Sequence, residues 1–245
     1  FSETKITPGE TLLFFDEIQE CERALLSLRY FYEEMPELPV VAAGSLLEFT
    51  LADHEFSMPV GRVEYLHLGP LGFSEFLGAV DSGLVCYLDA AGRFEEIPDT
   101  AHTRLAERLR EFLFVGGMPE AVSEFLESGS LMGVREVQRS IVETYQDDFA
   151  KYARRQDLAR LHGVFQRVPV NIGRKIKYVN LSREDLARDT KGCVDLLIRA
   201  QVCHRVSASH CSGLPLAAGE NPRAFKLISM DVGIVNFLCG GRWES

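Results

Sequence analysis

Two adjacent carboxylates follow the first apolar run of the chain. Leu12 to Phe15 has the length of a fully buried parallel strand, and Asp16 and Glu17 come directly after it. The acids are therefore expected at the carboxyl end of a strand, where open α/β sheets bind ligands. An aspartate there can hold Mg²⁺ through water, and the glutamate can polarise a water for in-line attack on a γ-phosphate. The alternative is that the acids only mark where the chain emerges into water after a strand.

Two further residues stand where such a site would need them. The next buried strand is expected at Val40 to Ala43, and Ser45 follows it after a glycine. Ser45 could hydrogen-bond the attacking water or the phosphate, or it could cap the helix that follows. Arg62 precedes a third expected strand and could contact a phosphate in the same chain or in a neighbouring subunit. Taken alone, Arg62 is more typical of an ordinary surface arginine.

The elements around these residues alternate between strand and helix. Apolar residues recur at steps of three and four from Leu25 to Met35, which predicts a helix that two prolines end. A third, shorter strand is expected at Val63 to Leu68. Strand, helix and strand in this order predict a right-handed crossover and a parallel sheet. Because buried parallel strands need neighbours, further strands are expected upstream of Phe1.

The middle of the chain predicts helices. A short amphipathic piece spans Phe73 to Leu77, and residues 80–100 are expected to form a loop because they contain Gly, Asp and Pro. Apolar stripes at helical spacing then predict three helices. These are a helix around Leu105 to Leu113 that stops at Gly116-Gly117, a helix opened by Pro119, and the strongest stripe, from Val134 to Tyr152.

The last third predicts short helices followed by a hairpin. Leu158 to Val168 carries a helix stripe, and Ser182 with Asp185 is typical of a helix start. Val202 to Val206 and Phe225 to Ile228 are expected strands on either side of a loop with Gly and Pro. This is the order of elements in a winged helix.

A local basic group lies in this last third. Arg174, Lys175 and Lys177 are candidate nucleic-acid contacts, because winged helices often place one helix in the major groove and basic residues on phosphates. The net charge of −10 argues against broad, non-specific coating of nucleic acid. A solvated face or a protein-contact surface is the alternative interpretation.

Composition is that of a soluble globular protein. Hydrophobic residues make up 46% and charged residues 25% of the chain. No apolar run has the length of a membrane span, so no membrane partner is expected. The six cysteines are scattered without a Cys-x-x-Cys pair, which favours a reduced, cytoplasmic protein. The chain starts at Phe1 in mid-pattern, so we expect a fragment or the ordered part of a longer chain.

Several segments together resemble a widespread bacterial and archaeal group of AAA+-type P-loop ATPases that carry a C-terminal domain of unknown function. The resemblance spans nearly the whole chain. The segments that carry it are Leu12–Gln19, Leu28–Glu33, Ala42–Leu47, Pro59–Val63, Leu68–Leu77, Gly116–Glu120, Tyr145–Tyr152, Leu214–Leu216 and Phe225–Gly233.

This resemblance implies a Walker B role for Asp16 and Glu17 and a sensor-like role for Ser45. Arg62 stands at the group's Gly-Arg position, and its phosphate contact is our own inference. The resemblance also implies ATP and Mg²⁺ as cofactors of the intact protein. The phosphate-binding loop, Gly-x-x-x-x-Gly-Lys-Ser/Thr, lies upstream in such relatives and does not occur in these 245 residues. The fragment itself is therefore expected to bind ATP weakly or not at all and to carry no cofactor.

The fold class expected from the sequence is α/β, in three parts. Residues 1–78 form the distal part of an incomplete P-loop parallel sheet, residues 79–155 a helical region, and residues 156–245 a winged-helix-like domain. The expected function of the intact protein is that of an Mg²⁺-dependent, ATP-hydrolysing switch, and an oligomer is compatible with it. The alternative is a non-enzymatic module that binds DNA or a protein partner through the winged helix.

Overall fold

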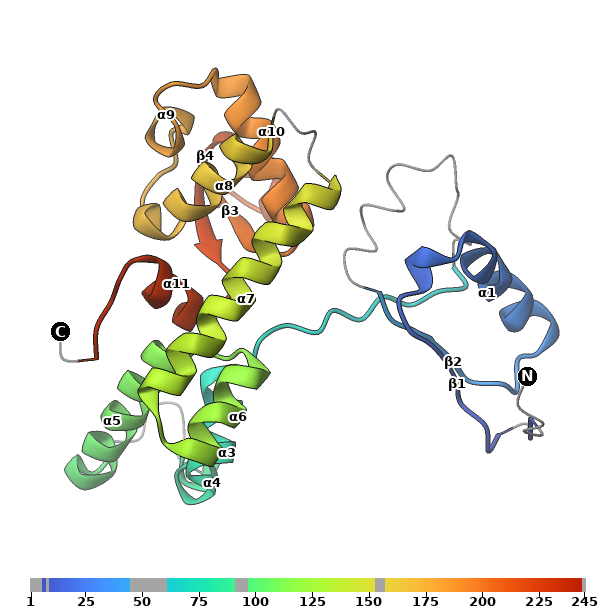
Figure 1. Ribbon diagram of the computed structural model, residues 1–245, viewed down its shortest axis with the longest axis horizontal. Coiled ribbons are helices and arrows are strands. Elements are labelled where there is room, and N and C mark those ends of the chain that lie inside the picture. Colours follow the sequence, from blue (N-terminus) through green and yellow to red (C-terminus); the bar gives the residue numbers. More distant parts are fainter. Residues whose placement is uncertain (1–5, 8, 45–60, 91–96, 153–156, 244–245) are drawn as a thin grey trace. The chain divides into compact units, whose positions relative to one another are not determined.

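The computed structural model divides the chain into two compact units, Phe1–Leu68 and Gly69–Ser245 (Figure 1). It describes residues 6–7, 9–44, 61–90, 97–152 and 157–243. The three-part division predicted above, with boundaries near residues 78 and 155, remains a prediction.

The first unit contains the predicted strand–helix–strand segment. Its elements are β1 (Leu13–Phe15), η1 (Ile18–Glu20), α1 (Glu22–Glu34) and β2 (Val40–Ala42). β1 and β2 pair in parallel, with Leu13 opposite Val40. The Phe15 and Phe31 rings pack 5.9 Å apart and join β1 to α1. The predicted strands, helix and parallel pairing are confirmed.

The third expected strand, at Val63 to Leu68, is wrong. These described residues form neither strand nor helix, and Leu66 and Leu68 are 90% and 103% exposed. A strand needs a neighbour that satisfies its backbone N–H and C=O groups. Among the described residues, β1 and β2 pair only with each other, so the apolar run has no strand beside it.

The second unit begins with helices that pack around aromatic rings. They are α3 (Phe73–Val80), α4 (Ser82–Ala90), α5 (Asp99–Val115), α6 (Pro119–Ser128) and α7 (Leu131–Tyr152). Phe76 is fully buried and contacts the rings of Phe112 and Phe125. Pro119 opens α6 as predicted, because its missing N–H is one that a helix start leaves unbonded anyway.

Helix α4 contradicts the loop expected over residues 80–100. Its Leu84 is buried in one cluster with Leu77 of α3 and Leu105 of α5. Burial against two neighbouring helices therefore stabilises a helix in a segment rich in turn residues. Residues 91–96 of the expected loop lie outside the described residues.

The second unit ends with short helices and a hairpin. These elements are α8 (Leu158–Arg167), η2 (Pro169–Asn171), α9 (Tyr178–Leu181), α10 (Ala187–Arg199), β3 (Cys203–Ser209), η3 (Leu216–Gly219), β4 (Glu220–Ser229) and α11 (Val232–Leu238). β3 and β4 pair antiparallel, with Cys203 opposite Ser229, as the predicted hairpin requires. The N–H of Ile176 donates to Phe225 O at 2.9 Å, so the segment before α9 lies beside β4.

The expected helix start at Ser182 is also wrong. Ser182 follows α9, and α10 begins five residues later at Ala187. The Ser182 hydroxyl instead donates to Asp185 Oδ2 at 2.6 Å. Asp185 Oδ1 accepts from Arg160 Nε at 2.7 Å, which ties this connection to α8. The polar pair that suggested a cap belongs to a connection between helices.

Buried Asp231 joins α11 to the turn between α5 and α6. Its Oδ1 accepts from Ile234 N at 2.7 Å and caps α11, and its Oδ2 accepts from Gly117 N at 2.6 Å. Gly117 O accepts from Leu71 N at 2.7 Å, and a side chain at Gly117 would collide with the Leu71 backbone. Three sequence segments therefore meet at this carboxylate.

Candidate functional site

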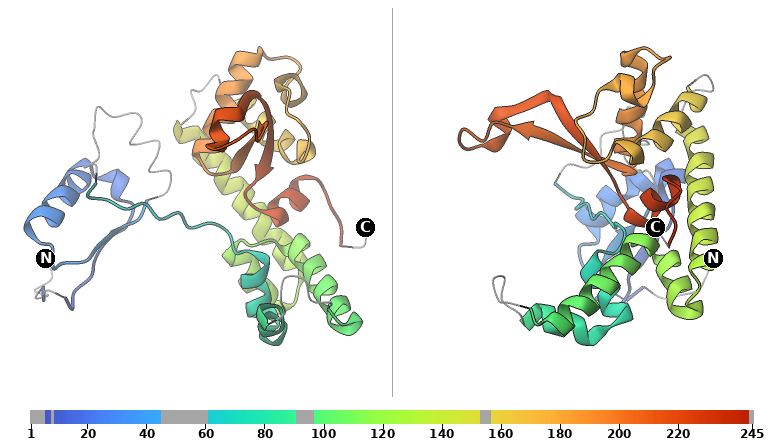
Figure 2. Two further views of the ribbon diagram at one scale, coloured as in Figure 1. Left: turned by 180° about the vertical axis from the view of Figure 1, so that it is seen from behind. Right: turned by 90° about the vertical axis from the view of Figure 1, so that its left-hand side faces the viewer.

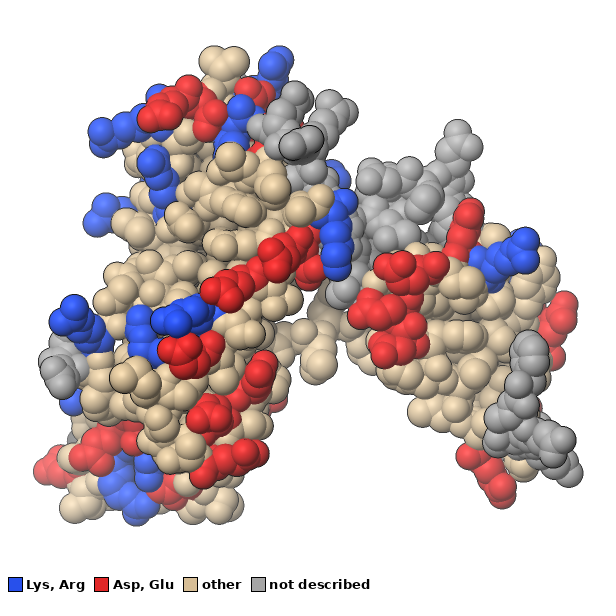
Figure 3. Space-filling model, viewed as in Figure 1, with Lys and Arg blue, Asp and Glu red and all other residues tan. Residues whose placement is uncertain are grey.

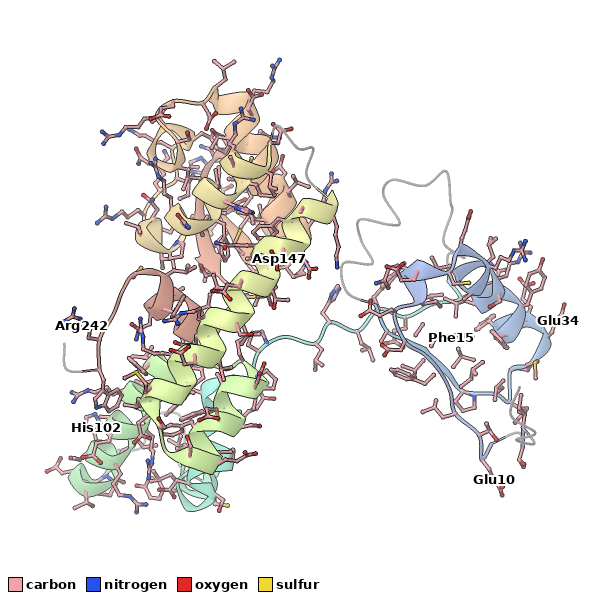
Figure 4. All side chains as sticks on the ribbon, viewed as in Figure 1. Glu10, Phe15, Glu34, His102, Asp147 and Arg242 are labelled. Atoms are coloured by element: carbon pink, nitrogen blue, oxygen red, sulfur yellow. The ribbon has the colours of Figure 1, made fainter. Side chains whose placement is uncertain are left out.

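Asp16 and Glu17 lie directly after β1, whose last residue is Phe15 (Figure 4). Both carboxylates are exposed. The end of the neighbouring strand is held beside them, because Ala43 N donates to Phe15 O at 2.8 Å and Ile18 N donates to Ala43 O at 3.0 Å. The acidic pair and the end of β2 therefore share the carboxyl edge of the parallel sheet. That edge is where sheets of this kind bind ligands.

The backbone of Glu17 adopts a left-handed conformation, with φ 47° and ψ 48°. This conformation is uncommon for a residue with a side chain and costs on the order of 1 kcal/mol or more. Its N–H donates to Asp16 Oδ1 at 3.1 Å. The turn moves Glu17 out of the line of β1 and starts η1 at Ile18. Glu17 thus departs from the extended backbone of β1.

Gln19 connects Glu17 to the end of β2. Its Nε2 donates to Glu17 Oε2, and its Oε1 is buried without a hydrogen-bond partner in the described part of the chain. The side chain lies against Gly44, where a Cβ would collide with the amide oxygen. Gly44 thus permits the close approach. Gln19 belongs to a segment that carried the resemblance, but only its contacts in the structure indicate a role.

The other two predicted site residues are placed differently. Ser45 lies outside the described residues. Arg62 Nη2 forms an ion pair with Glu33 Oε1 at 2.8 Å, so the structure places it against α1. Arg29 donates to the same oxygen at 3.0 Å and lowers the pKa of Glu33, with a smaller contribution from the charge of Arg62. Asp16 and Glu17 are therefore the predicted site residues that the structure brings together.

The predicted basic group lies between η2 and α9. Arg174, Lys175 and Lys177 are exposed, and none forms an ion pair within the described residues. Ile176 between them is buried and bonded to β4, which fixes the backbone that carries the three cations. Figure 3 shows basic side chains projecting from the part of the second unit around α9.

Within the described residues, no three His, Cys, Asp or Glu side chains gather as they would around a bound metal ion. Burial raises the pKa of Cys193 to about 11 and that of Cys203 to about 12, so both thiols are neutral at pH 7. None of the described helices combines the length and apolar character needed to cross a membrane.

Comparison with known families gives two matches. Residues 1–77 match the family model of an AAA domain, and this match includes the strand–helix–strand segment. Residues 106–245 match a model described as a domain of unknown function (DUF8612). The match to DUF8612 covers more than half of the chain, so the chain belongs to the DUF8612 family. No curated protein matches it.

These matches confirm the coarser part of the sequence prediction. A segment similar to an AAA domain precedes a C-terminal domain of unknown function, as the motifs indicated. The Walker B roles and the winged helix are finer than a family match, and they stay predictions.

Proposed function

We propose that the chain contains the water-activating part of an ATP-hydrolysing switch protein. The observation that carries the proposal is the exposed pair Asp16 and Glu17 at the carboxyl edge of a parallel sheet, in a segment that matches an AAA domain. Nucleotide-hydrolysing sheets place their acidic residues at this edge. A cytoplasmic protein that acts as an oligomer is compatible with the same proposal.

Asp16 fits the role of a magnesium ligand. Hard cations take oxygen ligands, and Asp16 presents an exposed carboxylate. Its Oδ1 accepts from Glu17 N, and within the described residues Oδ2 accepts no hydrogen bond. Asp16 would hold Mg²⁺ through water. When bound with ATP, Mg²⁺ neutralises charge on the phosphates.

Glu17 fits the role of the residue that orients water and accepts its proton. The left-handed backbone and the hydrogen bond from Gln19 hold its carboxylate at the sheet edge. Gln19 is then a positioning residue that fixes Glu17 relative to the end of β2. Ser45 would contact the water or the γ-phosphate from that strand. Arg62 would reach a phosphate only after leaving Glu33.

The test is Glu17→Gln in the intact protein. Loss of the carboxylate should lower the hydrolysis rate about 10²–10⁴-fold while ATP binding persists, because a general base acts in the transition state. Glu20→Gln is the matched control: it removes the same charge from an exposed residue of η1 and should leave hydrolysis near the wild-type rate. Unchanged hydrolysis in Glu17→Gln would contradict the proposal.

A second candidate function is favoured by the order of elements in the last third. Helix α8, the segment that pairs with β4 through Ile176, helices α9 and α10, and the β3–β4 hairpin follow one another as in a winged helix. We propose that residues 156–245 are such a module and bind DNA or a protein partner. In the DNA case Arg174, Lys175 and Lys177 contact phosphates. Replacing all three by Ala should then abolish salt-dependent binding to a generic duplex.

A further inference from the structure

The N-terminal part of the chain is acidic and the C-terminal part is basic. Residues 1–150 contain 10 Lys and Arg against 28 Asp and Glu, a net charge of −18. Residues 151–245 contain 16 Lys and Arg against 8 Asp and Glu, a net charge of +8, and the two values sum to the overall −10. The acidic total therefore conceals a basic C-terminal part. Such a part attracts polyanions locally even when the whole chain is acidic.

Helix α10 separates its residues into an apolar face and a basic face. Thr190, Cys193, Val194 and Leu197 are buried, with exposures of 0–3%. Arg188, Lys191 and Arg199 lie on the opposite side and are exposed. At about 100° per residue these three cations fall within roughly 80° of one another around the helix axis. Asp195 falls in the same sector, so the exposed face of α10 is a narrow stripe of three cations and one carboxylate, with a net charge of +2, and we call it the basic stripe.

Four nearby carboxylates are paired with cations. Asp157 and Asp185 bind Arg160 at 2.6 and 2.7 Å. Asp195 binds Lys191 at 2.9 Å, and Asp189 lies 3.4 Å from Arg188. In the described part of the region, the cations that form no ion pair are Arg167, Arg174, Lys175, Lys177, Arg183, Arg199 and Lys226. Glu184 and Glu220 likewise form no ion pair within the described residues, so the unpaired charge of this region is positive on balance.

The basic stripe lies close to the hairpin and to the segment of residues 174–177. Tyr178 packs on Phe225 with ring centroids 5.9 Å apart, and Arg205 stacks on the same ring at 4.2 Å. Lys191 of α10 is close enough to Arg205 of β3 for the two charges to interact, so α10 lies next to β3. The hairpin projects from the helices, as the right-hand view of Figure 2 shows. A helix and a projecting hairpin therefore flank one basic region.

We propose that this region binds duplex DNA, with the stripe Arg188, Lys191 and Arg199 facing the major groove and residues 174–177 contacting the phosphate backbone. An α-helix has the diameter that the major groove of DNA admits. In helix-turn-helix motifs, the second helix contacts base edges through its N-terminal residues. Arg188 stands in the first turn of α10. The inference rests on the second candidate function and is independent of ATP hydrolysis.

The test compares three variants of the 245-residue chain with the wild type. Binding to a labelled duplex of about 20 base pairs is measured by fluorescence anisotropy at about 50–200 mM salt. The variants are Arg188→Ala with Arg199→Ala, the triple Ala variant at Arg174, Lys175 and Lys177, and a matched control with Arg104→Ala and Arg139→Ala. The control arginines are exposed residues of α5 and α7 and remove the same charge as the α10 pair. Thermal unfolding verifies that each variant folds.

The α10 variant should bind the duplex roughly 10–100-fold more weakly than the wild type. The slope of log affinity against log salt should become shallower by about 2, since each phosphate-contacting cation contributes about 0.9. The control variant should stay within about twofold of the wild type. Single-stranded DNA and RNA of the same length should bind more weakly than the duplex.

Several results would overturn the proposal in distinguishable ways. If the triple variant alone loses binding, residues 156–245 bind DNA but α10 does not face it, and the inference fails while the second candidate function stands. If the control variant loses as much affinity for the duplex as the α10 variant, the loss reflects net charge alone and the proposed α10 contact is wrong. If the wild type binds no duplex, both fail, and an acidic protein becomes the partner to test. Tighter binding of RNA would replace the duplex assignment.

Discussion

Each carboxylate of the acidic pair accepts a hydrogen bond from a nearby residue. Asp16 accepts from the Glu17 N–H, and Glu17 accepts from the Gln19 amide. Without such hydrogen bonds, exposed carboxylate side chains would sample several rotamers. The hydrogen bond from the Gln19 amide restricts the rotamers of Glu17. Because the same amide lies against Gly44, just after β2, it also fixes Glu17 relative to that strand. A positioning role of this kind should affect the chemical step more than nucleotide binding.

Gln19→Ala in the intact protein tests that role. We expect kcat for ATP hydrolysis to fall about tenfold while KM changes little, because Glu17 keeps its charge but loses its orientation. Steady-state hydrolysis over a range of ATP concentrations separates the two constants. Gln19→Glu is the informative companion: a second carboxylate beside Glu17 should repel it, lower kcat further and shift the pH profile. A rise in KM at unchanged kcat would contradict the positioning role.

At the scale of elements, one buried carboxylate connects α11 to the α5–α6 turn. Burial raises the pKa of Asp231, against the opposing effect of hydrogen bonds from the N–H groups of Gly117, Ile234 and Gly233. Asp231→Ala removes the cap and leaves donors unpaired, so the free energy of unfolding should fall by about 1–3 kcal/mol. Urea denaturation followed by circular dichroism measures this change. An effect below about 0.5 kcal/mol would show that the connection contributes little.

The same carboxylate predicts a pH dependence with a definite sign. Because the pKa of Asp231 is higher in the folded chain than in the unfolded chain, the folded chain binds the proton more strongly. This contribution to stability is present below the pKa that Asp231 has in the unfolded chain, about 4. It is lost as pH rises through the higher pKa of Asp231 in the folded chain. Asp231→Asn cannot titrate, so the stability of the wild type relative to this variant should decline with rising pH. A constant difference between pH 4 and pH 8 would refute the assignment.

At the scale of the whole molecule, the proposed ATP hydrolysis requires a phosphate-binding loop in addition to the acidic pair. The 245 residues contain no Gly-x-x-x-x-Gly-Lys-Ser/Thr segment, and such a loop supplies the backbone N–H groups and the lysine that hold the phosphates. We therefore expect this chain alone to bind Mg-ATP only weakly, with a dissociation constant in the millimolar range or above. Isothermal titration of the purified chain measures it. Micromolar affinity would contradict the expectation and imply a different nucleotide site.

Local patterns predicted most elements. The apolar run before Asp16, the stripe in α7 and the two hairpin strands were predictable because periodicity and turn residues depend on neighbours in the sequence. The edge position of Asp16 and Glu17 followed from the same rule. Helix α4 was missed because its stability depends on burial of Leu84 between Leu77 and Leu105, which no local pattern contains.

The sequence by itself determined which chemical groups are present and where the first strand ends, because both follow from residue order. The tertiary structure decided which groups meet. It left Val63 to Leu68 without a strand partner, paired Arg62 with Glu33, and brought Gln19 between Glu17 and Gly44. It also turned one face of α10 inward and so exposed a basic stripe. Contacts between distant residues depend on the packing of whole elements, and packing is a property of three-dimensional shape that local sequence does not specify.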